Sequence, residues 1–325
     1  MKFIQRMKRT IKIAGVCKAI LYSVPVVIIN FFLNCDRVVT LYRVKKKADQ
    51  GFVIREINGS KMVLDVNDEG LPQQLIMNPV REPYSMQVVS RIIEAGNCVV
   101  DIGANMGYYA LFESRLVGEN GVVYAIEPVK RTFEILQHNI ALNNYCNIET
   151  ANLGIGERKG TAAMFLGKQS NLNSMNSNLG LTTSKVDVEI NSLDNFLRGR
   201  RYPKFIRMDV EGYEYEILKG MSGLLNDNSR LIILMELHFQ LLDRKQSAMI
   251  LDTLNASGFK ILTAIFEPTV GIRNGTLLNL LDSCQMKLHS APIRSGYWQV
   301  SIDDLLRNQD VMEGKLESLE IFFER

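Results

Sequence analysis

Residues 99–109 read Val-Val-Asp-Ile-Gly-Ala-Asn-Met-Gly-Tyr-Tyr, and this stretch decides the fold. Its apolar strand stops at Asp101, and the turn into the next helix carries Gly103, Asn105 and Gly107. Glycine lets the backbone approach a ligand closely, and asparagine is among the few other residues that tolerate a positive φ. The loop is therefore predicted to contact a ligand, although a glycine-rich turn can also serve only to pack a helix on a strand.

The spacing of the glycines separates two classes of ligand. The dinucleotide fingerprint is Gly-x-Gly-x-x-Gly. Here two glycines lie four residues apart, with Asn105 between them and Asp101 two residues ahead of the first. This arrangement is typical of S-adenosylmethionine sites. A nicotinamide-dependent oxidoreductase is the alternative, disfavoured because the third glycine is missing.

Apolar strands and helical stretches alternate after this loop. The predicted core strands are Cys98–Asp101, Val122–Ile126, Ile148–Leu153, Phe205–Met208 and Leu231–Met235. The predicted helices are Tyr108–Val117, Arg131–Leu142 and Tyr213–Leu225. Buried strands separated by helices predict an α/β fold, a doubly wound Rossmann-like sheet with helices on both faces. Ligands of such sheets bind at the carboxyl ends of the strands.

Other segments frame the sheet. Asn58-Gly59 joins two β-rich stretches, 52–57 and 61–65, and predicts a hairpin. A half-exposed strand is predicted over 186–190, after a loop near the site mouth at 169–184. A capping box at 301–304 predicts a C-terminal helix with an apolar side made of Leu305, Leu306, Met312, Leu316 and Leu319. The predicted parts are a basic apolar segment (1–47), a hairpin lead-in (48–82), the α/β domain (83–265) and an extension ending in a helix (266–325).

Acidic side chains follow the ends of several predicted strands. Glu127 follows the second strand, where a carboxylate can accept both hydroxyls of a ribose. Asp209 and Glu211 follow the fourth strand, and Glu236 and His238 end the fifth. His238 is a candidate general base because its unperturbed pKa lies near neutrality. Taken singly, each acid could be a solvated strand end and the histidine a structural one.

Composition and charge exclude several classes of protein. Apolar residues make up 46% and charged residues 22%, which indicates a folded globular chain rather than a disordered or polytopic membrane protein. The five cysteines are scattered without a Cys-x-x-Cys pair, which argues against a disulfide framework or a zinc cluster. Residues 1–47 contain eleven Lys or Arg and one acid, which gives this segment a net charge of +10. Because the whole chain has a net charge of +3, the remaining body, residues 48–325, has a net charge of −7. Such a body is a poor candidate for binding nucleic acid.

The basic N-terminal segment surrounds a charge-free stretch at 19–35. This stretch is shorter than the roughly 20 residues that span a bilayer, and it contains Pro25 and Asn30. No small-residue cleavage site follows it, so a signal peptide is disfavoured. We expect an apolar helix that spans or lies on the membrane and holds a cytoplasmic protein at its inner face. The alternative is a helix packed on its own domain.

The sequence between about Met86 and Thr263 resembles the FkbM family of S-adenosylmethionine-dependent methyltransferases. The resemblance rests on these blocks: Val100-Asp-Ile-Gly-Ala-Asn-Met-Gly-Tyr108, Ala125-Ile-Glu-Pro128, Asn139 with Asn143, Asn191-Ser-Leu-Asp194, Met208-Asp-Val-Glu-Gly-Tyr-Glu214, Leu218-Lys-Gly220 and Met235-Glu-Leu-His238. The Asp-Val-Glu-Gly block is specific to that family. The first 50 and the last sixty or so residues lie outside the resemblance.

The resemblance implies a Rossmann-like methyltransferase sheet and methyl transfer, usually to a hydroxyl oxygen of a sugar, glycolipid or related natural product. Asp101, Gly103, Asn105 and Gly107 would then hold the methionine part of S-adenosylmethionine, and Glu127 its ribose. Asp209, Glu211, Glu236 and His238 would face the acceptor, which we expect to be a small molecule or a lipid-linked glycan.

The resemblance leaves the activation of the acceptor hydroxyl open. One possibility is a general base, either His238 or Asp209, with Glu236 beside them. The other is Mg²⁺ bound by Asp209, Glu211 and Glu236, which would lower the pKa of the hydroxyl. A membrane-tethered protein that binds the cofactor without turnover is a rival of another class. The sequence does not identify the acceptor, the position methylated or the oligomeric state.

Overall fold

The computed structural model describes residues 40–46, 48–167, 169–176, 184–266, 287–288, 291–292, 296–316 and 318–325. Residues 40–46 are helical. The predicted apolar helix at 19–35 lies outside the described residues, and so does most of the proposed membrane segment. Within the described part, none of the helices has the length and hydropathy needed to cross a bilayer.

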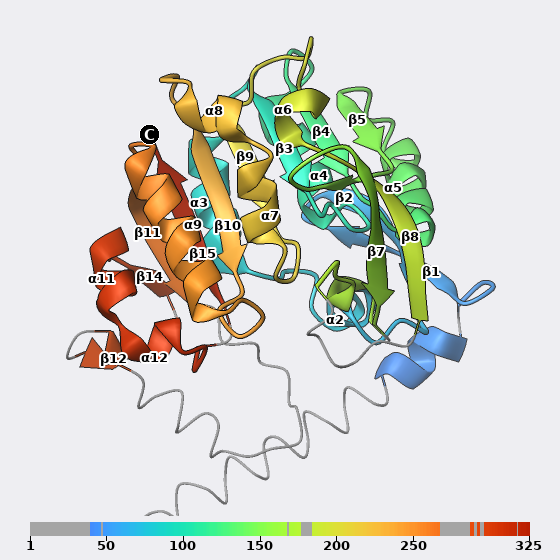
Figure 1. The fold of residues 1–325 in the computed structure, drawn as a ribbon. Helices are drawn as coiled ribbons and strands as arrows, with labels where there is room; N and C mark the ends of the chain where they lie inside the picture. The colour runs from blue at the N-terminus through green and yellow to red at the C-terminus, as the bar shows by residue number, and fades with distance from the viewer. Residues whose placement is uncertain are drawn as a thin grey trace, which may run out of the picture.

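An eight-stranded mixed sheet forms the centre of the molecule (Figure 1). Its order is β14 (Gly296–Trp298), β11 (Lys260–Phe266), β15 (Leu319–Glu324), β10 (Ile232–Leu237), β9 (Phe205–Met208), β3 (Cys98–Ile102), β4 (Val122–Ile126) and β5 (Ile148–Ala151). The strands from β10 to β5 run parallel, whereas β15 is antiparallel to both β10 and β11. This confirms the Rossmann-like α/β fold.

Helices cover both faces of this sheet (Figure 1). One face packs against α2 (Leu71–Met77), α3 (Pro83–Ile92), α4 (Tyr108–Val117) and α5 (Lys130–Leu142). The other packs against α6 (Leu193–Phe196), α7 (Glu214–Lys219), α8 (Ser222–Asn226), α9 (Arg244–Ala256), α11 (Ile302–Arg307) and α12 (Gln309–Met312). Val99 faces the first layer and Val100 the second, because successive strand residues point to opposite faces. Strands buried on both sides therefore read as continuous apolar runs.

The N-terminal hairpin forms as predicted, from β1 (Phe52–Ile57) and β2 (Ser60–Asp65). Asn58 and Gly59 both have positive φ, 49° and 78°, as a two-residue hairpin turn requires. The hairpin is fixed to α5 because the Val63 N–H donates to Asn139 Oδ1 at 2.7 Å. The Asn139 amide also donates to the Met106 carbonyl, which ties the hairpin to the glycine-rich loop.

A small three-stranded sheet lies beside the main one, in the order β6 (Gly154–Ile155), β8 (Ser184–Asn191) and β7 (Gly160–Leu166). The predicted strand at 186–190 is the middle of β8. Sequence reasoning missed β7. The described part of the predicted loop contains a 3₁₀ turn at Ser170–Leu172.

The C-terminal prediction was wrong in its secondary structure. The capping box at Ser301 is present, but it starts the short helix α11. A break at Asn308 separates α11 from α12, and Leu319 begins a strand instead of ending a helix. The reason is that Ile321 and Phe323 face one layer of the core and Phe322 the other, so the apolar run suits a strand buried on both faces. The extension therefore adds β14 and β15 to the main sheet. Its two-residue strands β12 (Lys287–Leu288) and β13 (Ala291–Pro292) pair with each other in a separate small sheet.

The helix predicted over 213–225 is also interrupted. Gly220 and Met221 are not helical, and they separate α7 from α8. A β-carbon on Gly220 would lie 2.0 Å from the Gly156 carbonyl oxygen, so the close approach of these two backbones requires the glycine.

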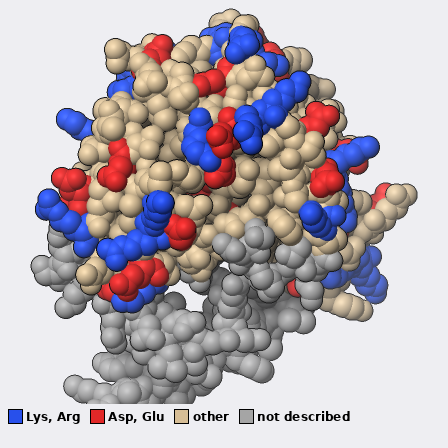
Figure 2. Space-filling model, in the orientation of Figure 1, with Lys and Arg blue, Asp and Glu red and all other residues tan. Residues whose placement is uncertain are grey.

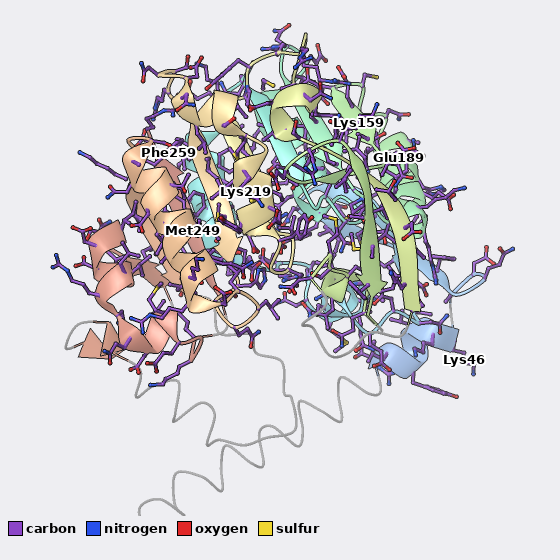
Figure 3. The ribbon with its side chains drawn as sticks, viewed as in Figure 1. Lys46, Lys159, Glu189, Lys219, Met249 and Phe259 are labelled. Carbon is purple, nitrogen blue, oxygen red and sulfur yellow. The ribbon has the colours of Figure 1, made fainter. Side chains whose placement is uncertain are left out.

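The described surface carries mixed charge on the face seen in Figure 2, where Lys and Arg are interspersed with Asp and Glu. Phe259 follows α9 and is buried against the sheet, where the Arg325 guanidinium lies 4.6 Å from its ring centre (Figure 3). Arg325 thus packs its guanidinium against a buried aromatic ring.

Candidate active site

A cleft of about 820 Å³, counting the space open to solvent, lies at the carboxyl ends of β3 and β9. The sheet order reverses there, because the chain passes from β3 to β4 and β5 on one side and from β9 to β10 on the other. Such a switch point is where open α/β sheets bind ligands. Gly103, Asn105, Glu127, Asp209 and Glu211 line this cleft, so the sheet brings together five of the predicted site residues.

The carboxylate of Glu127 organises one end of the cleft. It accepts the Asn105 N–H at 3.0 Å and the Val129 N–H at 2.8 Å, one on each oxygen. Burial raises the pKa of Glu127 to about 7, against the opposing effect of these two donors. Asn105 has the positive φ expected from its sequence position, 49°, and its side-chain amide donates to the Ser170 carbonyl. The predicted loop at the site mouth therefore contacts the glycine-rich loop.

Gly103 and Gly107 have different roles. Gly103 has φ +83° and lies against the backbone of Asp209. Gly107 precedes α4 with φ +97°, and a β-carbon there would lie 2.8 Å from the Leu136 side chain. Gly107 is absent from the described residues that line the cleft, so it acts through helix packing.

Asp101 lies beneath the cleft instead of in its wall. Its side chain is fully buried, and its Oδ1 accepts a hydrogen bond from Arg207 Nη1 at 3.2 Å. Arg207 also donates from Nη2 to Asp209 Oδ2 at 2.9 Å, and its guanidinium stacks 4.0 Å from the centre of the Tyr109 ring. One buried arginine thus joins the acid of the first loop to the acid of the second.

The two aspartates that share Arg207 differ in pKa. Burial raises the pKa of Asp101, and Arg207 only partly opposes it. Burial also acts on Asp209, but Arg207, His238 and Arg81 together outweigh it and hold its pKa below the ordinary value. The carboxyl group that lines the cleft is therefore the more acidic of the two.

His238 lies at the centre of an acidic cluster. Its Nδ1 is 2.9 Å from Glu214 Oε1, and its Nε2 is 3.3 Å from Glu211 Oε2 and 3.5 Å from Glu236 Oε1. Burial lowers the pKa of His238, but Glu211, Glu236 and Glu214 raise it well above its ordinary value. The acidic surroundings therefore favour the protonated form of the ring.

This arrangement does not support His238 as the direct general base. His238 and Glu236 are absent from the described residues that line the cleft, whereas Glu211 in front of them is present. Both ring nitrogens face carboxylates, and a protonated ring has no free lone pair. Glu236 is bound from behind by Ser318 Oγ at 2.8 Å, a residue of the C-terminal extension. The sequence correctly predicted that these three residues lie at one edge of the sheet. It did not predict that Glu236 and His238 lie behind Glu211.

Sequence reasoning missed several residues of the site. Arg81 and Glu82 line the cleft from the turn before α3, and Glu82 has a left-handed backbone with φ 53°. No local pattern marks them. The sequence did contain a signal for Arg207, because a charged side chain within an apolar buried strand is rare unless it is paired.

The structure also changes the predicted metal ligands. Asp209, Glu211 and His238 each offer a ligand atom, and these atoms lie within 4.8 Å of one another. In the described part of the chain, Glu236 is not part of such a group. The donor set is thus two carboxylates with one imidazole, in place of the three carboxylates expected for Mg²⁺.

Comparisons with known proteins match the chain to methyltransferases. The family model described as "Methyltransferase FkbM domain" matches residues 101–261. The chain is 25% identical over 144 residues to "Methyltransferase 1" of Beauveria bassiana, covering 38% of this chain and 57% of that protein. It is 28% identical over 156 residues to "Methyltransferase sdnD" of Sordaria araneosa, covering 38% and 60%. The matched region thus spans less than two thirds of each of these relatives.

Among solved structures, an S-adenosylmethionine-dependent O-methyltransferase of Thermotoga maritima matches with a TM-score of 0.38 and 11% identity. The match covers 76% of this chain and 66% of that one. The complex of TYW2 from M. jannaschii with S-adenosylmethionine matches with a TM-score of 0.38 and 13% identity, covering 86% and 88%.

Proposed function

We propose that the protein, whose residues 101–261 form a methyltransferase domain of the FkbM family, transfers the methyl group of S-adenosylmethionine to a hydroxyl oxygen of a sugar, glycolipid or related natural product. The observation that carries this proposal is that one cleft joins the Gly103–Asn105 loop and Glu127 at one end to Asp209 and Glu211 at the other. A donor and an acceptor can then meet across the switch point of the sheet.

The cofactor end fits S-adenosylmethionine through its hydrogen-bonding groups. The Glu127 carboxylate accepts one N–H on each oxygen, and each oxygen keeps a lone pair for a ribose hydroxyl. Asn105 fixes the loop through three hydrogen bonds, to Glu127, Ser170 and Met106. The cofactor supplies an activated methyl group on its sulfonium.

The acceptor end suits a hydroxyl group. Carboxylates accept hydrogen bonds from hydroxyls, and Asp209 is kept in position by Arg207. An aliphatic hydroxyl is a poor nucleophile until its proton is drawn away, so an acidic edge beside the methyl group serves the reaction. The main contribution of the chain is alignment of the oxygen with the methyl carbon and the sulfur.

Binding of the cofactor is the first test. The full chain is titrated calorimetrically with S-adenosylmethionine and, separately, with NAD, alongside Glu127→Ala and the exposed control Glu119→Ala. We expect S-adenosylmethionine to bind, Glu127→Ala to weaken it at least tenfold and Glu119→Ala to leave it unchanged. Binding of NAD alone would replace the proposal with the oxidoreductase alternative.

The acceptor is tested with a methyl-labelled cofactor. The protein is incubated with panels of neutral glycans, glycolipids and polyketide-type alcohols, and the product is analysed for the atom that carries the label. A methyl ether supports the proposal, and label on nitrogen or carbon contradicts it. Cofactor binding without transfer to any of these panels would favour the non-catalytic alternative.

We further propose that residues 1–47 attach the protein to the cytoplasmic face of the membrane, which suits a lipid-linked glycan acceptor. The helical residues 40–46 support this proposal, because Val44 is buried in the core while Tyr42, Arg43, Lys45 and Lys46 are exposed (Figure 3). Flotation of the full chain with anionic and with neutral vesicles tests it. We expect flotation only with the anionic vesicles, and a chain that stays unbound to both in low salt contradicts it.

A further inference from the structure

We propose that Asp209, Glu211 and His238 bind one divalent transition-metal ion at the acceptor end of the cleft. This inference rests on the proposed function, because it assigns how the acidic edge acts on a hydroxyl acceptor. It also differs from the expectation based on sequence, which was Mg²⁺ on Asp209, Glu211 and Glu236.

The first argument is geometric. Asp209 and Glu211 follow β9, and His238 follows the neighbouring strand β10, so the sheet fixes two separate backbones beside each other. Their ligand atoms lie within 4.8 Å of one another, and His238 Nε2 is 3.3 Å from Glu211 Oε2. Two ligands of one such ion lie up to roughly 4.4 Å apart, since each bond is about 2.0–2.2 Å long. Small side-chain movements are enough to close the site.

The second argument is the orientation of the imidazole. Glu214 is fully buried, and its Oε1 lies 2.9 Å from His238 Nδ1 while also accepting the Gly212 N–H. A carboxylate bonded to the far nitrogen is the usual outer partner of a metal-binding histidine, because it fixes the tautomer and the ring. Nε2 is then the nitrogen that faces Glu211, which lines the cleft.

The third argument is the spacing on the two sides of the ring. Hydrogen bonds between charged N–H and carboxylate groups are about 2.7–2.9 Å long. The Nδ1 contact at 2.9 Å has this length, but the Nε2 contacts at 3.3 and 3.5 Å are longer. Glu211 and Glu236 therefore face Nε2 without a close hydrogen bond to it, and the ligand atom of Asp209 lies within 4.8 Å of those of Glu211 and His238. A metal ion at this position would take the place of a proton on Nε2 and bind these oxygens at shorter distances.

The donor set indicates the class of ion. Carboxylate oxygens alone suit Mg²⁺ and Ca²⁺, whereas a mixture with imidazole suits Mn²⁺, Fe²⁺, Co²⁺ or Zn²⁺. When bound, such an ion supplies a Lewis acid that lowers the pKa of a nearby hydroxyl. The role of Asp209, Glu211 and His238 is then to hold it, and the role of Glu214 is to orient His238.

Mn²⁺ is the probe of choice because it is paramagnetic. The full chain is purified without a histidine tag, treated with chelator and titrated with Mn²⁺, and free and bound Mn²⁺ are measured by electron paramagnetic resonance. We expect one ion per chain. His238→Gln and Asp209→Asn should weaken binding at least a hundredfold, and Glu214→Gln by about 10–100-fold. The matched control is His138→Gln, which removes an exposed histidine of α5 and should bind as the wild type does.

A spectroscopic measurement on the unaltered chain makes the test independent of variant folding. The electron spin echo of bound Mn²⁺ should show coupling to one imidazole nitrogen. Bound Mn²⁺ without nitrogen coupling, or a chain that binds neither Mn²⁺ nor Zn²⁺, overturns the inference. These measurements use no cofactor or acceptor, so they separate the metal site from methyl transfer. Binding of S-adenosylmethionine by a chain that takes no metal would retain the proposed function and remove only this site.

Discussion

Gly103 lies so close to Asp209 that a β-carbon on it would be 2.1 Å from the Asp209 carbonyl oxygen. The contact joins the loop after β3 to the loop after β9 at the point where the sheet order reverses. The two loops that we propose bind the cofactor and the acceptor are therefore joined by one backbone contact.

Gly103→Ala should destabilise the protein and weaken cofactor binding. The left-handed backbone costs an alanine about 1–2 kcal/mol, and the backbone contact adds about 1–3 kcal/mol of overpacking. Gly96→Ala is the matched control, since Gly96 has φ +84° but nothing within 4 Å of the new β-carbon. Urea unfolding of the two variants measures the difference. Equal losses of unfolding free energy in the two variants would show that the backbone near Asp209 relaxes without an energetic cost.

Cofactor affinity should depend on pH through Glu127, whose pKa burial raises to about 7. Below that pH the carboxyl is protonated and loses acceptor capacity for the ribose hydroxyls, so affinity should fall by about tenfold between pH 8 and pH 6. Glu127→Gln should bind more weakly at pH 8 and show little dependence on pH. Calorimetric titrations at the two pH values check this, and a wild-type affinity that does not change with pH contradicts it.

Arg207→Met should cost about 3–5 kcal/mol, because it leaves the buried Asp101 and the partly buried Asp209 without their shared partner. The control is Arg230→Met. Its pair with Glu324 is 2.7 Å long, but the Arg230 side chain is 69% exposed, so the change should cost about 0–1 kcal/mol. Chemical denaturation measures both. A loss below 1 kcal/mol for Arg207→Met would mean that the two aspartates take up protons instead.

Glu113→Gln should stabilise the protein as pH rises. Both Glu113 carboxyl oxygens are buried without a hydrogen-bond partner among the described residues, and burial, aided by Asp101, raises the pKa well above 4.5. The folded state then holds a proton that the unfolded state releases. The contribution of Glu113 to wild-type stability therefore falls by about 1.4 kcal/mol per pH unit between its unfolded and its folded pKa.

The variant does not titrate, so its advantage should be small at pH 5 and should grow towards pH 8. Thermal and urea unfolding at pH 5, 6.5 and 8 measure it, with Glu119→Gln as the exposed control. A constant difference between variant and wild type over this range would contradict the raised pKa.

The sequence alone determined the local elements and the identity of the cleft loops. The run from Val99 to Asp101 and the Gly103–Gly107 turn carry strand and helix signals within a few residues, and they form β3 and α4 as predicted. Asn58-Gly59 likewise specifies its own hairpin. Because parallel strands share one edge, the sequence also placed Glu127, Asp209 and Glu211 together.

Tertiary structure decided what the side chains at that edge do. Asp101 and Arg207 are 106 residues apart, and only the pairing of β3 with β9 brings them together. The depth of His238 behind Glu211, and its contact with Glu214, depend on how three segments pack. The strand β15 joins β10 and β11 although its local pattern suited a helix. The periodicity of a short segment shows which face of that element is apolar. It does not show which distant segment will pack against that face, because this depends on the tertiary structure as a whole.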